Sequence, residues 1–133
     1  MAADKKPKKL LIVDDEEFAC KIYKKSLEQK GIETDIIHSG KEMIEKLRGN
    51  EKTYDVILLD IVMPEVDGLE ALEVARSEGL AKDTMFIIFS NRTDEVAQEK
   101  ARELDCKNFL IKSSLLPESL AEEVIKTYQE NIL

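Results

Sequence analysis

Apolar residues follow two alternating patterns along the chain. Four short runs are continuously apolar and have the length of a strand: residues 10–13, 56–59, 85–89 and 109–111. Because both faces of such a run are apolar, the pattern predicts parallel strands that are covered on both sides. A fifth segment, residues 34–38, mixes polar and apolar residues, so we expect it at the edge of the sheet.

Between these runs, apolar residues recur at the spacing of a helix. Gly31 and Gly79 follow the first and third stripes, Ser39 and Glu42 have the spacing of a capping box, and Pro117 suits a first helical turn. The five predicted stripes are Phe18, Ile22, Tyr23 and Leu27; Met43, Ile44 and Leu47; Leu69, Leu72 and Ala75; Val96, Ala97, Ala101 and Leu104; and Leu120, Val124, Ile125 and Tyr128.

This strand–helix alternation predicts an α/β fold. Crossovers between parallel strands are right-handed, so we expect a doubly wound five-stranded parallel sheet, (βα)5, with helices on both faces. The length of 133 residues fits one domain. We assign it to residues 9–133, after a basic N-terminal arm, residues 1–8, that we expect to be flexible.

Charge and composition argue against several classes of protein. The net charge of -8 argues against a general nucleic-acid or membrane binder. No apolar run approaches the ~18 residues of a membrane span, and the start does not resemble a signal peptide, so we expect a cytoplasmic protein. Cys20 and Cys106 are interpreted as reduced thiols, and His38 as structural.

The residues directly after the apolar runs form one set. In open parallel sheets the ligand site lies beyond the carboxyl ends of the strands, where the strand order reverses. Asp14 and Asp15 follow the first run, Asp60 the 56–59 run, Ser90 the fourth strand and Lys112 the fifth. Residues that are distant in sequence should therefore meet at one edge of the sheet.

Three carboxylates in one pocket repel each other unless a cation is present. A few protein oxygens scattered over two strand ends suit Mg²⁺ better than Ca²⁺. A lysine and a hydroxyl facing such a site complete the groups that phosphoryl transfer needs, with a carboxylate as nucleophile. Taken singly, each residue has a structural alternative: Asp14 or Asp15 could cap a helix, and Glu16 and Glu17 are better explained as complements to a helix dipole.

Four separated motifs, "LLIVDDEE", "DVILLDIVMPEVDG", "FIIFSN" and "NFLIKS", together resemble the CheY-like receiver domain of two-component response regulators. The resemblance runs from about Lys9 to the C-terminus. It implies a flavodoxin-like fold with strand order 2-1-3-4-5. It also implies a signalling module that catalyses its own phosphorylation and dephosphorylation, rather than an enzyme with a separate substrate.

The resemblance also implies roles for individual residues. Asp60 would be the phosphoacceptor, converted to 4-aspartylphosphate, and Lys112 would bind the phosphoryl group. Asp14, Asp15, Asp60 and the backbone carbonyl of Val62 would bind Mg²⁺. Ser90 would be the switch hydroxyl and Phe109 the switch aromatic, although Phe109 also fits as a core residue.

The implied partners are a sensor histidine kinase or phosphotransfer protein (or a small phosphodonor) and a downstream effector protein. We expect no direct contact with nucleic acid or membrane, and a monomer or a phosphorylation-dependent homodimer. Phosphorylation would switch the surface of the fourth helix, fifth strand and fifth helix. The chain is either a stand-alone receiver or part of a longer protein.

Three positions depart from the family pattern: Asn91, the long cationic Arg92 next to it, and Ser113. Ser113 replaces the proline that usually follows the lysine in a cis peptide, so either a costly cis bond or a rearranged loop is expected. Asn91 stands where a small residue is usual. We hypothesise that Val62 and Asn91 shield the acyl phosphate and alter its lifetime.

Three other functions have less support in the sequence. A pseudo-receiver with a decayed site is favoured only by Asn91 and Ser113. A haloacid-dehalogenase-type phosphatase needs an aspartate where Val62 stands. A nucleotide-binding flavodoxin relative needs a Gly-rich phosphate loop after the first strand, which the sequence does not contain.

Overall fold

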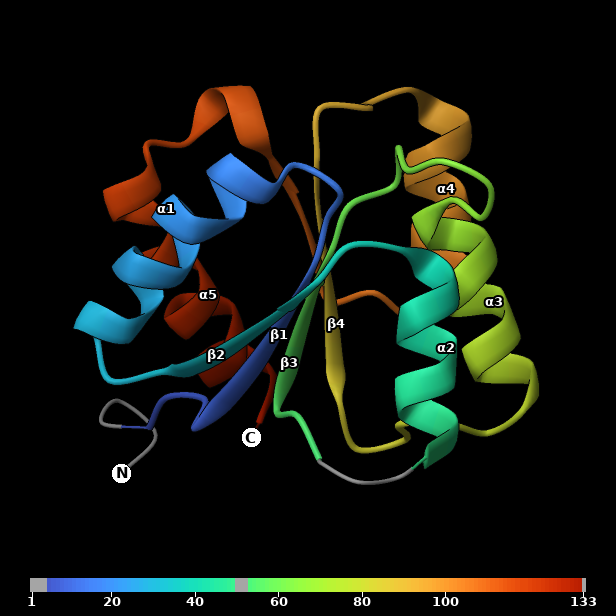
Figure 1. Ribbon diagram of the computed structural model, residues 1–133, viewed down its shortest axis with the longest axis horizontal. Coiled ribbons are helices and arrows are strands. Elements are labelled where there is room, and N and C mark those ends of the chain that lie inside the picture. Colours follow the sequence, from blue (N-terminus) through green and yellow to red (C-terminus); the bar gives the residue numbers. More distant parts are fainter. Residues whose placement is uncertain (1–4, 50–52, 133) are drawn as a thin grey trace.

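A five-stranded parallel sheet lies at the centre of the computed structural model, which describes residues 5–49 and 53–132 (Figure 1). The strands run in the order β2-β1-β3-β4-β5, as predicted. Their bounds are β1 Lys9–Val13, β2 Glu33–Ile37, β3 Val56–Leu59, β4 Met85–Ser90 and β5 Asn108–Ile111. The mixed segment, now β2, is an edge strand as expected.

Helices cover both faces of the sheet. α1 and α5 lie on one face, and α2, α3 and α4 lie on the other (Figure 1). Their bounds are α1 Glu17–Gln29, α2 Gly40–Gly49, α3 Gly68–Ser77, α4 Glu95–Glu103 and α5 Pro117–Asn131, with a short 3-10 helix, η2, at Lys112–Ser114. The predicted doubly wound α/β fold is therefore confirmed.

Side chains of the continuous apolar runs contribute to two separate hydrophobic cores. Leu11 and Val13 of β1 point into the core under α2, α3 and α4, whereas Leu10 and Ile12 point into the core under α1 and α5. This alternation is what a strand requires, because successive side chains point to opposite faces. Both faces are covered, so neither set of positions is polar.

Local signals set the helix starts. The backbone N–H of Glu42 donates to Ser39 Oγ at 3.1 Å, which confirms the predicted cap of α2. Asp67 caps α3 through a reciprocal capping box with Glu70. Pro117 is the first residue of α5, where its missing N–H costs no hydrogen bond.

The predicted apolar stripe of α1 is wrong at two positions. Phe18 and Ile22 are 80% and 42% exposed, and Cys20, which was not in the predicted stripe, is buried. Leu27 is buried as predicted. Residues two positions apart on a helix differ by about 200° in direction, so Phe18 and Ile22 face away from Cys20. Val96 in α4 is likewise exposed, beside the buried Ala97.

Part of the predicted basic arm lies outside the described residues. Of the remainder, the backbone carbonyl of Lys5 accepts a hydrogen bond from Gln129, and the N–H of Lys8 donates to Asp55 at 2.7 Å. The flexibility of the arm stays a prediction.

Candidate active site

Three strand ends bring the predicted polar set together. Asp14 follows β1, Asp60 follows β3 and Lys112 follows β5. The N–H of Asp60 donates to the carbonyl of Val13 at 3.0 Å, and that of Asp14 to the carbonyl of Ile37. Both carboxylates are therefore fixed by the main chain at the point where β1 separates β2 from β3 and the strand order reverses.

The ammonium group of Lys112 lies between two buried carboxylates. Its Nζ is 2.5 Å from Asp14 Oδ2 and 3.0 Å from Asp60 Oδ2, and all three side chains are almost fully buried. The same Nζ lies 3.3 Å from Glu16 Oε1, whose side chain is largely exposed. One cation thus faces three carboxylates, with Asp15 close by.

This excess of negative charge shifts the pKa values of Asp14 and Lys112. Burial raises the pKa of Asp14 above its ordinary value, and the hydrogen bond and charge of Lys112 offset this effect only in part. Burial alone would lower the pKa of Lys112, but the hydrogen bond to Asp14 and the charges of Asp60 and Asp14 raise it overall. The lysine is therefore firmly protonated, and the carboxylates lack enough positive charge to be fully neutralised.

The donor set fits a hard divalent cation. Carboxylate oxygens of Asp14, Asp15 and Asp60 lie within 4.8 Å of one another. Asp14 Oδ2 is buried, and it shares the ammonium group of Lys112 with Asp60 and Glu16. A cluster of carboxylate oxygens that shares one ammonium group suits Mg²⁺, a hard cation that takes oxygen ligands.

An open cleft of about 470 Å³ gives access to Asp60. Asp60, Ser90 and Lys112 line it together with Asp15, Glu16, Val62, Asn91 and Arg92, whereas Asp14 is not among the lining residues. A molecule entering the cleft therefore meets Asp60 before Asp14. Val62 is 60% exposed at its mouth.

Ser90 is fully buried at the end of β4, and its Oγ accepts the N–H of Arg92 at 3.2 Å. Phe109, the predicted switch aromatic, is half-buried on the neighbouring strand β5 and packs against the core under α2, α3 and α4. The core interpretation of Phe109 is thus met in this conformation. Its role as a switch stays a prediction.

The loop after Lys112 is rearranged rather than cis. The described residues contain no cis peptide bond, and Lys112–Ser114 forms the short helix η2. The N–H of Ser113, which a proline would lack, donates to Asn91 Oδ1 at 2.8 Å. Two of the three departures from the family pattern, Asn91 and Ser113, therefore contact each other.

Sequence reasoning missed two contributors to the site. Glu16 was explained by the helix dipole, but its carboxylate reaches Lys112. Gly68 begins α3 directly against the backbone of Asp60: an added Cβ would lie 2.0 Å from the carbonyl oxygen of Asp60. The run "DDEE" could have suggested Glu16, whereas nothing in the spacing of Gly68 indicates that contact.

Asp15 was also predicted at the site, and it is exposed at the cleft. The alternative in which it caps α1 is not what the structure has, because the cap residue is Glu16 and makes no side-chain cap bond. Asp14 Oδ1 instead accepts the N–H of Glu16 at 3.0 Å.

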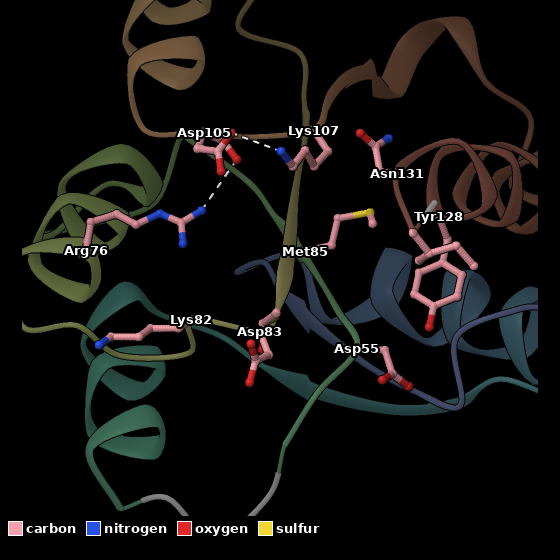
Figure 2. A pocket seen from close by; sticks show the side chains of 11 residues that line it. Asp55, Arg76, Lys82, Asp83, Met85, Asp105, Lys107, Tyr128 and Asn131 are labelled. Carbon is pink, nitrogen blue, oxygen red and sulfur yellow. Dashed lines mark hydrogen bonds and ion pairs between the residues drawn. The ribbon is translucent and has the colours of Figure 1, made fainter.

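A second cleft, of about 240 Å³, lies at the opposite edge of the sheet (Figure 2). Four of its charged side chains make structural contacts. Asp55 accepts the N–H groups of Lys8 and Lys9, Lys107 pairs with Asp105, and Arg76 donates to the carbonyl of Leu104. Acidic and basic residues are equal in number in its lining, so it has no excess of negative charge like that of the acidic cleft.

The two cysteines and His38 are not among the residues that line the acidic cleft. Cys20 and Cys106 are free thiols, and burial raises the pKa of each to about 12. His38 Nδ1 lies 2.9 Å from the backbone carbonyl of Asp14, a contact that supports the strand end.

Comparison with known proteins agrees with this geometry. The sequence model of the response regulator receiver domain matches residues 10–124. The chain belongs to this family. That result favours a receiver over the phosphatase and nucleotide-binding alternatives, and it makes the chain a component of the two-component type, whose receivers generally accept a phosphoryl group.

Individual relatives of this receiver are moderately similar. It is 30% identical over 122 residues to the polar-differentiation response regulator DivK of Brucella anthropi, an alignment that covers 92% of this chain and 96% of DivK. It is 36% identical over 85 residues to the transcriptional regulatory protein TrcR of Mycobacterium tuberculosis, covering 64% of this chain and 32% of TrcR. The match thus spans about a third of the length of TrcR.

A solved structure supports the family fold of this receiver. The receiver domain of the Francisella response regulator 1452 superposes with a TM-score of 0.77 at 27% identity, covering 94% of this chain and 98% of that one. In the described ranges, no helix combines the length and hydropathy needed to cross a membrane.

Proposed function

We propose that this receiver accepts a phosphoryl group on Asp60 and uses Mg²⁺ to do so. One observation carries the proposal: the buried Lys112 ammonium lies 2.5 Å from Asp14 and 3.0 Å from Asp60, at the ends of three different strands. A purely structural ion pair needs one carboxylate, whereas this lysine holds two that would otherwise repel each other.

Asp60 is the nucleophile because it is the buried carboxylate that lines the cleft. One of its oxygens attacks the phosphorus atom and forms a new P–O bond. The bond from phosphorus to the donor breaks, and the donor (a phosphohistidine nitrogen or the oxygen of a small acyl phosphate) leaves with the electron pair. Asp60 attacks as the carboxylate and gives up no proton.

Asp14, Asp15, Asp60 and the backbone carbonyl of Val62 would hold the metal ion. When bound, Mg²⁺ would neutralise carboxylate charge and charge on the phosphoryl oxygens. Lys112 then exchanges its contact with Asp60 for a phosphoryl oxygen. Ser90 donates its hydroxyl hydrogen to another oxygen, after releasing the N–H of Arg92.

The added charge biases a two-state equilibrium. Phosphorylation replaces the single negative charge of the Asp60 carboxylate with a phosphoryl group that carries about two. The end of β3 therefore gains about one negative charge, and the loops that follow β4 and β5 adjust to it. The surface formed by α4, β5 and α5 follows directly from these loops, so a downstream effector protein, or a second copy, would read the state there. The donor would be a cytoplasmic sensor histidine kinase or a phosphotransfer protein.

Phosphoryl uptake tests the proposal. The protein is incubated with acetyl phosphate and Mg²⁺, and its intact mass is compared for the wild type, Asp60→Asn and Asp83→Asn. Asp83 is an exposed aspartate in the opposite cleft and serves as the matched control. We expect one phosphoryl group on the wild type and on Asp83→Asn, and none on Asp60→Asn or after addition of EDTA. Labelling of Asp60→Asn at the wild-type rate would exclude Asp60 as the acceptor.

A further inference from the structure

A single side chain joins the two loops that carry Ser90 and Lys112. Asn91, in the loop after β4, accepts the backbone N–H of Ser113, in the loop after β5, with a distance of 2.8 Å. Ser90 pairs with Ile111 in the sheet, so Asn91 and Lys112 both lie one residue beyond the last paired position. The bond therefore continues the connection between β4 and β5 past the end of the ladder.

The bond lies next to both groups that face the cleft. Ser113 follows Lys112, whose Nζ contacts Asp14 and Asp60, and Asn91 follows the buried Ser90. β5 is an edge strand, so the main chain at Lys112 has a neighbouring strand on one side only. A movement of the Asn91 loop is passed to the lysine through this bond.

Both residues are needed for the contact. The acceptor is the side-chain carbonyl of Asn91, and alanine has no such group. The donor is the main-chain N–H of Ser113, and proline has no such group. The bond therefore depends on both residues. If either Asn91 or Ser113 is replaced in this way, the other residue loses this hydrogen bond.

We propose that Asn91 is a positioning residue that couples the loop carrying Ser90 to the loop carrying Lys112. The Ser90 hydroxyl and the Lys112 ammonium group then contact the phosphoryl group at the same time. The proposal rests on the phosphoacceptor function above. Asn91 acts on the phosphoryl group through Ser113 and Lys112. Without the bond, Lys112 samples positions away from the nucleophile, and the affinity for a phosphoryl group or its mimic falls.

The expected effect is that of one exposed hydrogen bond. Its loss should weaken Mg²⁺-dependent binding of beryllofluoride, a phosphoryl mimic, by about 3- to 10-fold. Because Asn91→Ala and Ser113→Pro remove the same bond, the double variant should bind no more weakly than the weaker of the two single variants. Independent effects would multiply instead.

The experiment measures beryllofluoride affinity for the wild type, Asn91→Ala, Ser113→Pro, the double variant and Ser113→Ala. Ser113→Ala is the matched control, because it removes the hydroxyl and keeps the N–H donor, and it should bind within about twofold of the wild type. Hydrogen exchange of the residue 113 amide reports the bond directly and should be faster in Asn91→Ala than in the wild type. A purely structural role would change the urea midpoint and leave the affinity of the folded protein unaltered.

The outcomes separate the two proposals. If the wild type binds no beryllofluoride, the phosphoacceptor function itself fails. If the wild type binds and Asn91→Ala binds equally well, or if the two single losses multiply in the double variant, the coupling role is wrong. Should Ser113→Pro not fold, the comparison of Asn91→Ala with Ser113→Ala still decides between the outcomes.

Discussion

The contact of Gly68 with the backbone of Asp60 leads to a quantitative prediction for Gly68→Ala. A Cβ at this position would lie 2.0 Å from the carbonyl oxygen of Asp60 and 3.1 Å from Cα of Ile61. Carbon atoms prefer separations of about 3.5–4.0 Å, so α3 and the end of β3 must move apart by more than about 1 Å. The movement also endangers the hydrogen bond from Gly68 N–H to the Ile61 carbonyl, now 2.9 Å.

The net cost follows from three contributions. Overpacking typically costs about 1–3 kcal/mol, and the lost hydrogen bond adds about 1 kcal/mol. Alanine gains at most ~1 kcal/mol over glycine at this first helical position. The free energy of unfolding should therefore fall by about 1–4 kcal/mol, a large part of the ~5–15 kcal/mol typical of a domain.

Urea denaturation followed by circular dichroism measures this change. With an m-value of about 1.5 kcal/mol/M, the midpoint should fall by about 0.7–2.7 M. Gly79→Ala is the control: its φ is +68°, and the nearest atom to an added Cβ is the flexible end of Lys82 at 3.2 Å. It should lose about 1–2 kcal/mol from backbone strain alone and phosphorylate normally. A Gly68→Ala midpoint within about 0.3 M of the wild type would refute the close-contact reasoning.

Three further predictions concern the acidic cleft. Lys112→Met should take up phosphoryl groups from acetyl phosphate about 10²-fold more slowly, because it removes the charge that faces Asp60; an unchanged rate of labelling would contradict this role. Val62→Asn and Asn91→Ala should both alter the decay of the phosphorylated protein, followed by intact mass, and equal decay in both variants and the wild type would disprove shielding. Mg²⁺ should raise the melting temperature near pH 7 and less at acidic pH, because burial raises the pKa of Asp14 and protons compete with the cation. Because the pKa of Asp14 is higher in the folded than in the unfolded protein, the metal-free protein loses stability as the pH rises through that pKa. A rise in melting temperature with Mg²⁺ that does not depend on pH would count against the metal site.

Much of the fold was predictable because its signals are strong and local. Runs such as 10–13 are apolar on both faces only if helices cover both sides of the sheet, and the observed division of Leu10 and Leu11 between two cores meets that condition. The site followed from topology, since parallel strands place their carboxyl ends at one edge. Asp14, Asp60 and Lys112 could therefore be brought together without any knowledge of distances.

The remaining features depend on details that a pattern does not contain. Apolar residues such as Phe18 fit a helical stripe in the sequence, but the rotation of α1 about its axis is set by packing against the sheet and α5. The contact between Asn91 and Ser113 depends on the path of two loops, and each residue taken alone suggested only a departure from the family. The close approach of Gly68 to Asp60 likewise depends on the angle at which α3 begins.

The central claim is that Asp60 receives the phosphoryl group, and locating the modified residue tests it most directly. The protein is phosphorylated with acetyl phosphate and Mg²⁺, the acyl phosphate is reduced with borohydride, and the altered residue is identified by tandem mass spectrometry. We predict modification of Asp60 alone, because it is the buried aspartate that lines the cleft beside Lys112 and Ser90. Modification of Asp14 or Asp15 in its place, or of no aspartate, would contradict the account.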